Sequence, residues 1–397
     1  MSNRKKILFL TSRIPFPLEK GDKLRAYYQI KYLSKNADII LCCISQEPLS
    51  IEADRELKKY VKEIYVYTTS KWSILYNMLV AGIYKLPFQV GFFFNTGAHY
   101  FFTKAIQKEQ PDHIFVQLIR MAEYVSKEKS IPKSLDYMDT FSKGIQRRML
   151  NASGIKKLAF RFEYNRLRKY EAKIYANFKN TYIISEQDKQ SFDFPESKDI
   201  KVSPNGVDHH FFKPNENIQK RYDLVFTGNM SYPPNVNAVM YIAKEIFPLL
   251  LKHKPDIKLL IAGATPTNAV KSLANANIHV SGWMDDIRDA YNESSIFIAP
   301  LQIGTGLQNK LLEAMSMELP CITSALANNA LKACDGEEIL IGETPEDYLH
   351  HILNLLQDQA LNIKIAQQGK QFVTNTYNWN AITKDLEQDF FNQNNIN

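Results

Sequence analysis

The chain is poor in the residues that mark several common protein classes. It has four cysteines in 397 residues, two of them adjacent (Cys42 and Cys43), and none in a Cys-x-x-Cys arrangement. This pattern excludes a disulfide framework, gives no indication of a zinc or other metal site, and favours a reducing cytoplasm. No stretch supplies the Gly-x-Gly-x-x-Gly fingerprint either, which argues against a dinucleotide oxidoreductase.

Long apolar runs are also missing. The first one, Ile7–Thr11, has the length of a strand and is too short for a signal peptide or a membrane helix. The most apolar zone, Trp72–Phe102, is interrupted by polar residues and a proline. Because a membrane helix needs about 20 predominantly apolar residues, no segment is expected to cross a bilayer.

Positive charge is concentrated in the first half of the chain. Residues 1–200 hold 34 Lys and Arg against 21 Asp and Glu, or +13, whereas residues 201–397 hold 15 against 21, or −6. A basic half can face a nucleic acid, an anionic membrane or an anionic substrate. The acidic second half and the absence of known nucleic-acid-binding modules argue against nucleic acid.

Short apolar runs alternate with helical stretches along the whole chain. This alternation predicts parallel sheets covered by helices, arranged as two successive Rossmann-like, doubly wound α/β domains. A turn-rich cluster, Ser203–Asp208, marks the boundary between them. The expected strands are Lys6–Thr11, Asp38–Ile44, Ile64–Thr68, His113–Gln117, Ser134–Met138, Thr181–Ser185, Tyr222–Gly228, Ile257–Gly263, Ile278–Gly282, Ser295–Pro300, Pro320–Ser324 and Glu338–Gly342.

Residues 304–324 carry the strongest local signal. Gly304 and Gly306 follow an apolar strand and allow a tight turn into a helix. The helical period places four apolar residues on one face (Leu307, Leu311, Ala314 and Met315) and four others opposite them (Gly306, Asn309, Lys310 and Glu313). A glycine turn with a cation and a carboxylate at the end of a strand is typical of a phosphorylated-ligand site. The alternative is a solvated Lys–Glu pair.

Two features of the first half are further candidates. The loop after the first strand holds Arg13, Lys20, Lys23 and Arg25, with a helix expected from about Asp22, and it suits phosphate or sugar hydroxyls. The alternative is a solvated basic loop. Later, Asp139 ends a strand, where it either faces the same site or caps a helix.

Several motifs together resemble the GT-B glycosyltransferases of family 4, which are retaining, metal-independent bacterial sugar transferases. Ser203–Asp208 is similar to the linker into the second domain of that family, and Gly304–Met315 is the most specific match. A branch of exopolysaccharide-type transferases is closer still through its motif "R-x-P-x-P…G-D-K-x-R". That motif stands here as Arg13, Pro15, Pro17, Gly21, Asp22, Lys23 and Arg25.

Three departures from the family pattern are visible. The family commonly has two glutamates eight positions apart; Thr305 occupies the first position and only Glu313 is present. The family's cations after the strand that ends at Gly228 are missing, because Asn229–Asn235 contains none. No match to its first-domain histidine is found, since that strand continues as Gln117–Arg120.

The resemblance implies a fold, an activity and a set of site residues. The fold is a GT-B fold, with two Rossmann-like domains facing a cleft: residues 1–202 for the acceptor, 203–375 for the nucleotide sugar, and a helix in 376–397 returning to the first domain. The reaction is transfer of a sugar from a nucleotide diphosphate sugar to an acceptor hydroxyl in cell-surface polysaccharide synthesis. An epimerase or hydrolase of the same fold, or an inactive scaffold, is the alternative.

The implied site residues fall into three groups. Catalysis is assigned to Lys310, Arg13 and Asp139. Acceptor binding is assigned to Gly21, Asp22, Lys23 and Arg25, with Arg13 or Lys23 reaching the donor diphosphate. Donor binding is assigned to Gly228, Asn229, Gly263, Trp283, Met284, Gly304, Thr305, Gly306, Leu307, Lys310 and Glu313.

No metal or cofactor is expected beyond the donor substrate itself. The expected partners are a nucleotide sugar, a glycan or lipid-linked acceptor and an anionic membrane, with no nucleic acid. The expected location is the cytoplasm, at the inner face of the plasma membrane. The patch expected to meet that membrane is Arg147–Lys169 together with Trp72–Phe102. The alternative is that the excess charge is spread evenly and merely solvates the domain.

Overall fold

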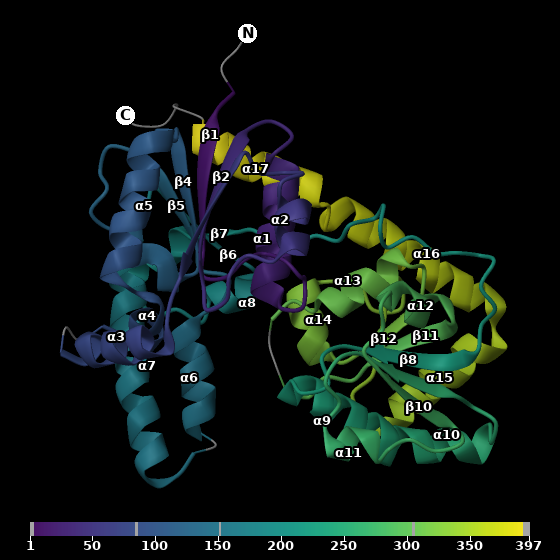
Figure 1. Cartoon of the computed structure of the whole chain (residues 1–397). Helices are drawn as coiled ribbons and strands as arrows, with labels where there is room; N and C mark the ends of the chain where they lie inside the picture. Colours follow the sequence, from purple (N-terminus) through teal and green to yellow (C-terminus); the bar gives the residue numbers. More distant parts are fainter. Residues whose placement is uncertain (1–3, 84–85, 151, 304–305, 392–397) are drawn as a thin grey trace. The chain divides into compact units, whose positions relative to one another are not determined.

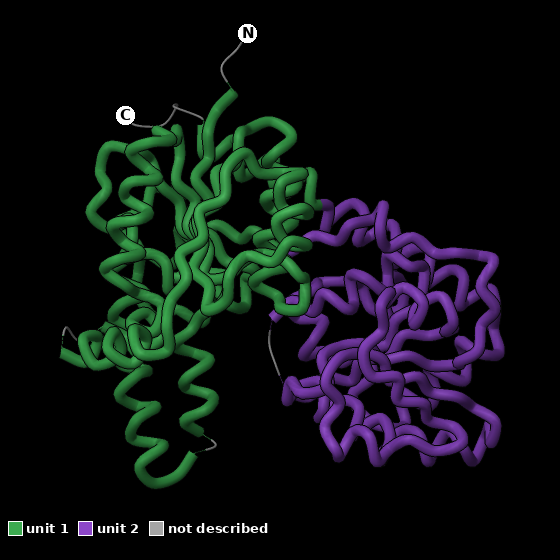
Figure 2. The backbone as a smooth tube through the Cα atoms, in the orientation of Figure 1, with its two compact units in different colours: residues 1–204, 379–397 green, residues 205–378 purple. Residues whose placement is uncertain are grey.

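The computed structural model describes residues 4–83, 86–150, 152–303 and 306–391. The chain forms two compact units, which Figure 2 shows in different colours. The first comprises Met1–Pro204 with Trp379–Asn397, and the second is Asn205–Asn378. The boundaries set from the sequence, after residues 202 and 375, lie within three residues of these.

The first unit is built on a seven-stranded parallel sheet in the order β3-β2-β1-β4-β5-β6-β7. The chain winds outward from β1 in both directions, so the strand order reverses between β1 and β4, the usual place for a ligand in such sheets. The strands are β1 (Lys6–Thr11), β2 (Asp38–Ser45), β3 (Glu63–Thr68), β4 (His113–Gln117), β5 (Lys133–Asp136), β6 (Asn180–Ile183) and β7 (Lys201–Val202).

Helices cover both faces of this sheet (Figure 1). They are α1 (Gly21–Leu33), α2 (Ile51–Leu57), α3 (Lys71–Ile83), α4 (Phe88–Phe93), α5 (Thr96–Glu109), η1 (Ile119–Val125), α6 (Phe141–Leu150), α7 (Gly154–Tyr175), α8 (Glu186–Lys189), η2 (Pro195–Asp199) and α17 (Trp379–Phe391). Alternate residues of β1 enter two different cores: Ile7 and Phe9 pack with α1 and α17, and Leu8 and Leu10 with α5 and α7.

The second unit repeats the plan with a six-stranded parallel sheet in the order β10-β9-β8-β11-β12-β13. The strands are β8 (Tyr222–Thr227), β9 (Leu259–Ala262), β10 (Ile278–Gly282), β11 (Ser294–Ala299), β12 (Cys321–Thr323) and β13 (Leu340–Ile341). The helices are α9 (Pro233–Tyr241), η3 (Ile242–Ile246), α10 (Phe247–His253), α11 (Asn268–Lys271), α12 (Ile287–Asn292), α13 (Asn309–Ser316), α14 (Ala325–Leu331), α15 (Pro345–Gln357) and α16 (Gln359–Thr376). Here the strand order reverses between β8 and β11.

The last helix, α17, returns to the first unit, as expected. Trp379 at its start is fully buried and stacks on Tyr28 of α1, with ring centroids 5.5 Å apart. Nearer its end, Asp389 accepts a hydrogen bond of 2.8 Å from the Tyr182 hydroxyl of β6. The helix therefore completes a core that the first 204 residues leave open.

All twelve strands expected from the sequence are present, and their ends differ from the expected ones by two residues at most. Buried parallel strands are nearly continuous apolar runs, which makes them easy to recognise. The short edge strand Lys201–Val202 was missed because both of its residues are exposed. Within the described residues, none of the helices combines the length and the apolar character needed to cross a bilayer.

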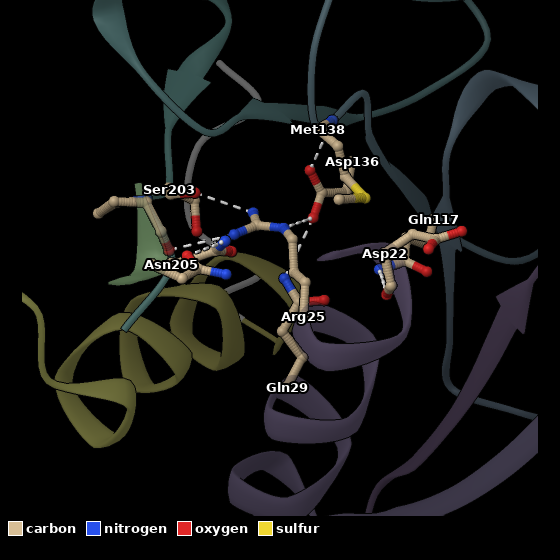
Figure 3. A network of polar contacts seen from close by, with 10 residues as sticks. Asp22, Arg25, Gln29, Gln117, Asp136, Met138, Ser203 and Asn205 are labelled. Carbon is tan, nitrogen blue, oxygen red and sulfur yellow. Dashed lines mark hydrogen bonds and ion pairs between the residues drawn. The ribbon is translucent and has the colours of Figure 1, made fainter. Parts of the chain in front are cut away.

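Arg25 of α1 lies in a buried network rather than at a binding surface, so its assignment to the acceptor was wrong. Its side chain is fully buried and pairs with the equally buried Asp136 at the end of β5, with 2.6 Å between Nε and Oδ2 (Figure 3). Its guanidinium also donates to the carbonyl oxygens of Ser203 (2.8 Å) and Pro204 (3.1 Å). Arg25 thus fastens the end of the first unit to its sheet.

Candidate functional site

The turn after β8 in the second unit brings Gly228 close to Gly263 and Lys310, which lie far from it in the sequence. Gly228 has φ of +152°, and a side chain there would lie 2.6 Å from the amide nitrogen of Asn235 and 3.4 Å from Lys310 Nζ. Gly263 directly follows the neighbouring strand, β9, with φ of +138°, and an added Cβ there would lie 1.9 Å from the Gly228 carbonyl oxygen. Both positions therefore require glycine, which allows this close approach.

Lys310 of α13 is the cation of this site. It is half-buried, and its Nζ lies 4.8 Å from the centroid of the Phe226 ring and donates a hydrogen bond to Asn235 Oδ1. The Asn235 amide nitrogen donates in turn to the Asn229 carbonyl oxygen at 2.9 Å. Burial lowers the pKa of Lys310 to about 7, against the opposing effect of Glu313. Because Asn235 is neutral, the hydrogen bond leaves the charge of the ammonium available to an anionic ligand.

Glu313, one turn further along α13, is held by a short chain of hydrogen bonds. The Tyr291 hydroxyl donates to Glu313 Oε2 at 2.8 Å and lies 2.8 Å from Thr227 Oγ1. Burial raises the pKa of Glu313, while the bond from Tyr291 and the charge of Lys310 act against that rise. A carboxylate fixed through one oxygen can accept hydrogen bonds from a ligand with its other oxygen.

The remaining donor-site candidates differ in their contacts and in their exposure to solvent. Asn229 uses its side-chain oxygen within the turn, accepting from Ser231 N at 2.9 Å and from Thr265 Oγ1 at 2.7 Å. Trp283 is 66% exposed, whereas Met284 is half-buried against the core of the second unit. Of these two, Trp283 is therefore the side chain more open to a stacking ligand.

The start of α13 differs from the expectation. The helix begins at Asn309, with Gln308 as its extended N-cap residue, so Leu307 precedes the helix instead of lying on its apolar face. Leu311, Ala314 and Met315 are buried, as the spacing predicted. Gly306 and Leu307 are half-buried. Gly304 and Thr305 lie outside the described residues.

The first unit gathers two arginines where its strand order reverses. Arg13 follows β1, pairs with Asp22 and lies 5.9 Å from the centroid of the Phe93 ring. Arg120 follows β4 and lies 4.9 Å from the same ring. Burial, with the nearby charge of Arg13, lowers the pKa of Arg120 to about 10. Guanidinium groups are well suited to binding anions, and of these two Arg13 already pairs with Asp22.

Strained backbone and a perturbed carboxyl group lie beside these arginines. Leu118 and Met138, just after β4 and β5, have φ of +69° and +63°, which is rare for residues with a side chain and often found at functional sites. Asp139 is accessible to solvent, but dense protein surroundings and Asp188 raise its pKa to about 7, while Arg120 acts in the opposite direction.

The other acceptor-site candidates occupy the first turns of α1. Gly21 is the first residue of this helix, and the carbonyl oxygen of Asp22 accepts a hydrogen bond of 2.9 Å from Gln117 Nε2. Lys23 bonds to Glu19 at 2.9 Å. Within the described residues, no three His, Cys, Asp or Glu side chains are grouped so that they could hold a metal ion.

Sequence reasoning missed Asn235, Tyr291 and the role of Arg120. Asn235 and Lys310 are 75 residues apart, and Tyr291 and Glu313 are 22 apart, so no local pattern links them. Arg120 could have been noticed as a cation directly after a buried strand, which is the end of the sheet where ligands bind.

Comparisons with known proteins agree with this architecture. Residues 221–358 match the family model described as glycosyl transferases group 1. Sucrose-phosphate synthase from Thermosynechococcus elongatus superposes with a TM-score of 0.70 at 13% identity, over 97% of this chain and 98% of that chain. The chain has the GT-B fold.

Two sequence relatives extend the comparison. An uncharacterized 44.6 kDa protein in the cps region of Klebsiella pneumoniae is 21% identical over 96% of this chain and 98% of its own length. The Escherichia coli UDP-Gal:alpha-D-GlcNAc-diphosphoundecaprenol alpha-1,3-galactosyltransferase is 27% identical over 45% of this chain and 50% of its own length. With the family model, these matches support a glycosyltransferase of the group 1 type.

Proposed function

We propose that this protein is a retaining, metal-independent family 4 enzyme that transfers a hexose from a nucleotide diphosphate sugar to an acceptor hydroxyl in bacterial cell-surface polysaccharide synthesis. The observation that carries the proposal is the pairing of Lys310 with Asn235 beside Glu313, where the strand order of the second unit reverses. It provides a cation for a diphosphate and a carboxylate for hydroxyl groups within two turns of one helix.

The donor is proposed to bind the second unit through its diphosphate, ribose and base. Lys310 and the backbone N–H groups before α13 would neutralise the charge that develops on the leaving diphosphate. Glu313 would accept hydrogen bonds from the ribose hydroxyls, and the base would rest near Trp283. The UDP-sugar in the name of the Escherichia coli relative makes UDP the first base to test.

The acceptor is proposed to bind the first unit. Arg13 and Arg120 would hold an anionic group of the acceptor, and Asp139 would orient its hydroxyl, which contributes by fixing the geometry of attack. The relative's lipid diphosphate acceptor is of this anionic type. We further propose that such an acceptor is met at the inner face of the plasma membrane.

The direct test is to incubate the purified chain with a panel of UDP- and GDP-sugars, with and without a lipid diphosphate acceptor analogue. Transfer that depends on the acceptor, with retained anomeric configuration, is the expected result. Hydrolysis or epimerisation unaffected by the acceptor would indicate the alternative enzyme classes. No turnover of any donor, together with intact nucleotide binding, would indicate a scaffold.

Glu313→Ala is expected to weaken binding of the matching nucleoside diphosphate by about 1–3 kcal/mol, the range for a lost hydrogen bond to a charged group. Isothermal titration calorimetry on the full chain measures this. Glu318→Ala is a suitable control, because Glu318 lies just beyond α13 and pairs with Lys370. Unchanged affinity in a folded Glu313→Ala variant would remove Glu313 from the site.

Transfer is expected to continue in excess chelator, because Lys310 and the helix-end amides are proposed to act in place of a divalent cation. Initial rates with and without EDTA provide the measurement, and a metal-dependent transferase assayed alongside serves as the control. Complete loss of turnover, restored by Mg²⁺ or Mn²⁺, would show that the proposed chemistry is wrong.

A further inference from the structure

Helix α3 of the first unit presents an apolar face to solvent. Five large side chains spaced along one side of the helix are exposed: Trp72 (81%), Leu75 (53%), Tyr76 (67%), Leu79 (66%) and Ile83 (78%). Residues three, four and seven positions apart share a helix face, so these five form one stripe. Leaving so much contiguous apolar surface in water is unfavourable, and such patches mark interaction sites.

A second exposed surface lies on α6 and α7, which run side by side (Figure 1). Leu150, Ile155, Leu158 and Phe162 are 50–87% exposed there. Residues 141–175 contain ten Lys and Arg but only two acidic residues, Glu163 and Glu171, and both of these are buried. The exposed part of this helix pair therefore combines apolar side chains with a strong positive charge.

The two surfaces are joined by direct contacts. The guanidinium of Arg166 in α7 donates to the carbonyl oxygens of Gly82 (3.0 Å), in the last turn of α3, and Leu86 (3.0 Å), beyond its end. It also lies 4.1 Å from the centroid of the Phe162 ring, which in turn is 6.2 Å from the Phe88 ring. Arg166 thus ties the end of α3 to α7, which makes the two surfaces neighbours in the first unit.

We infer that α3, together with α6 and α7, docks the first unit onto an anionic membrane surface. An apolar stripe flanked by lysine and arginine suits a lipid interface, where apolar side chains enter the acyl boundary and cations stay among anionic headgroups. A second copy of the chain would bring the same positive charge against itself, which disfavours self-association. The inference rests on the proposed function in one respect, which is that the acceptor is met at a membrane.

Flotation of the full chain with lipid vesicles tests the docking surface. The chain is expected to bind vesicles containing about one-third phosphatidylglycerol at low salt and to leave them at about 0.5 M salt. It is expected to bind pure phosphatidylcholine vesicles only weakly. The double variant Trp72→Ser, Leu79→Ser is expected to lower the partition coefficient by about tenfold or more. Ile51→Ser is the matched control, because Ile51 is 82% exposed on α2, outside this surface.

A charge variant separates the electrostatic contribution of α6 and α7 from the apolar contribution of α3. Replacing Lys156, Lys157 and Arg161 by glutamine is expected to lower binding to anionic vesicles by about tenfold to a hundredfold and to weaken its salt dependence. Equal partitioning to neutral and anionic vesicles, or binding unchanged in both multiple variants, would overturn the inference. So would a dimer in sedimentation experiments that the Trp72→Ser, Leu79→Ser variant abolishes.

Tryptophan fluorescence reports the depth of α3 directly. The chain has three tryptophans: Trp72, the buried Trp379 and the exposed Trp283. In a Trp283→Phe variant, a blue shift on vesicle binding and quenching by brominated lipids would then come from Trp72. Absence of both would overturn the insertion of α3. The Lys310→Ala variant should still float with the vesicles. The Trp72→Ser, Leu79→Ser variant, which is expected to lose membrane binding, should still transfer sugar to a soluble acceptor. Failure of docking and failure of the proposed transfer are therefore distinguishable.

Discussion

Lys310→Ala is expected to reduce kcat for sugar transfer by about 10²–10³-fold, which is the effect of removing one group that stabilises developing charge in a transition state. Lys310 is the cation that we place on the leaving diphosphate, and Asn235 holds its ammonium group beside Gly228. Steady-state kinetics with the donor identified in the panel provide the measurement. Activity above about a tenth of the wild-type value would remove Lys310 from the reaction.

The pH dependence of kcat/KM tests the role of Lys310 a second time. Because the pKa of Lys310 is lowered to about 7, its charge is present below that pH and is lost as the pH rises through it. The kcat/KM for the donor, which reports the free enzyme, is therefore expected to fall as the pH rises above about 7. Lys310→Arg keeps its charge and should flatten this decline. Lys271→Ala, an exposed lysine at the end of α11, should change neither rate nor profile.

Arg25→Met is expected to destabilise the first unit by about 3–5 kcal/mol, because it leaves the carboxylate of Asp136 buried without its ion-pair partner. At about 2–4 °C per kcal/mol for a unit of this size, its melting temperature should drop by roughly 10 °C. Differential scanning calorimetry of the full chain measures this. The second unit contains neither residue, so its transition serves as an internal reference.

Two further variants make the Arg25 prediction specific. Lys23→Met removes a cation two positions earlier on α1 whose partner Glu19 is exposed, so it should cost less than about 1 kcal/mol. The double variant Arg25→Met, Asp136→Leu removes both charges and should recover much of the lost stability. A loss below about 1 kcal/mol for Arg25→Met alone would contradict the structural role assigned to the pair.

The fold was predictable from the sequence because its signals are local. Each buried parallel strand is a short apolar run, and the boundary between the two units lies in a cluster of Pro, Asn and Gly at Ser203–Asp208. The candidate site was predictable only where it is local too, in the turn and helix that carry Lys310 and Glu313. The spacing of apolar residues gave the buried side of α13 correctly, but not the extended residue Gln308 that delays its start.

What could not be predicted depends on contacts between distant segments. Arg25 stands in a basic loop and helix start that suit an anion, yet its partner Asp136 is 111 residues away, and burial turns the pair into a structural element. Arg13 and Arg120 meet at Phe93 only because the strand order places β1 next to β4. Composition alone does not distinguish a buried cation from one that remains at the surface.

The return of α17 to the first unit has a consequence for synthesis on the ribosome. The second unit is one continuous stretch, Asn205–Asn378, whereas the first unit lacks Trp379 and Phe390 until α17 has been synthesised. Because domains fold as units while they emerge, the later-encoded unit can finish folding before the earlier-encoded one. A nascent first unit with an uncovered apolar face around Tyr28 is therefore the species that chaperones would protect.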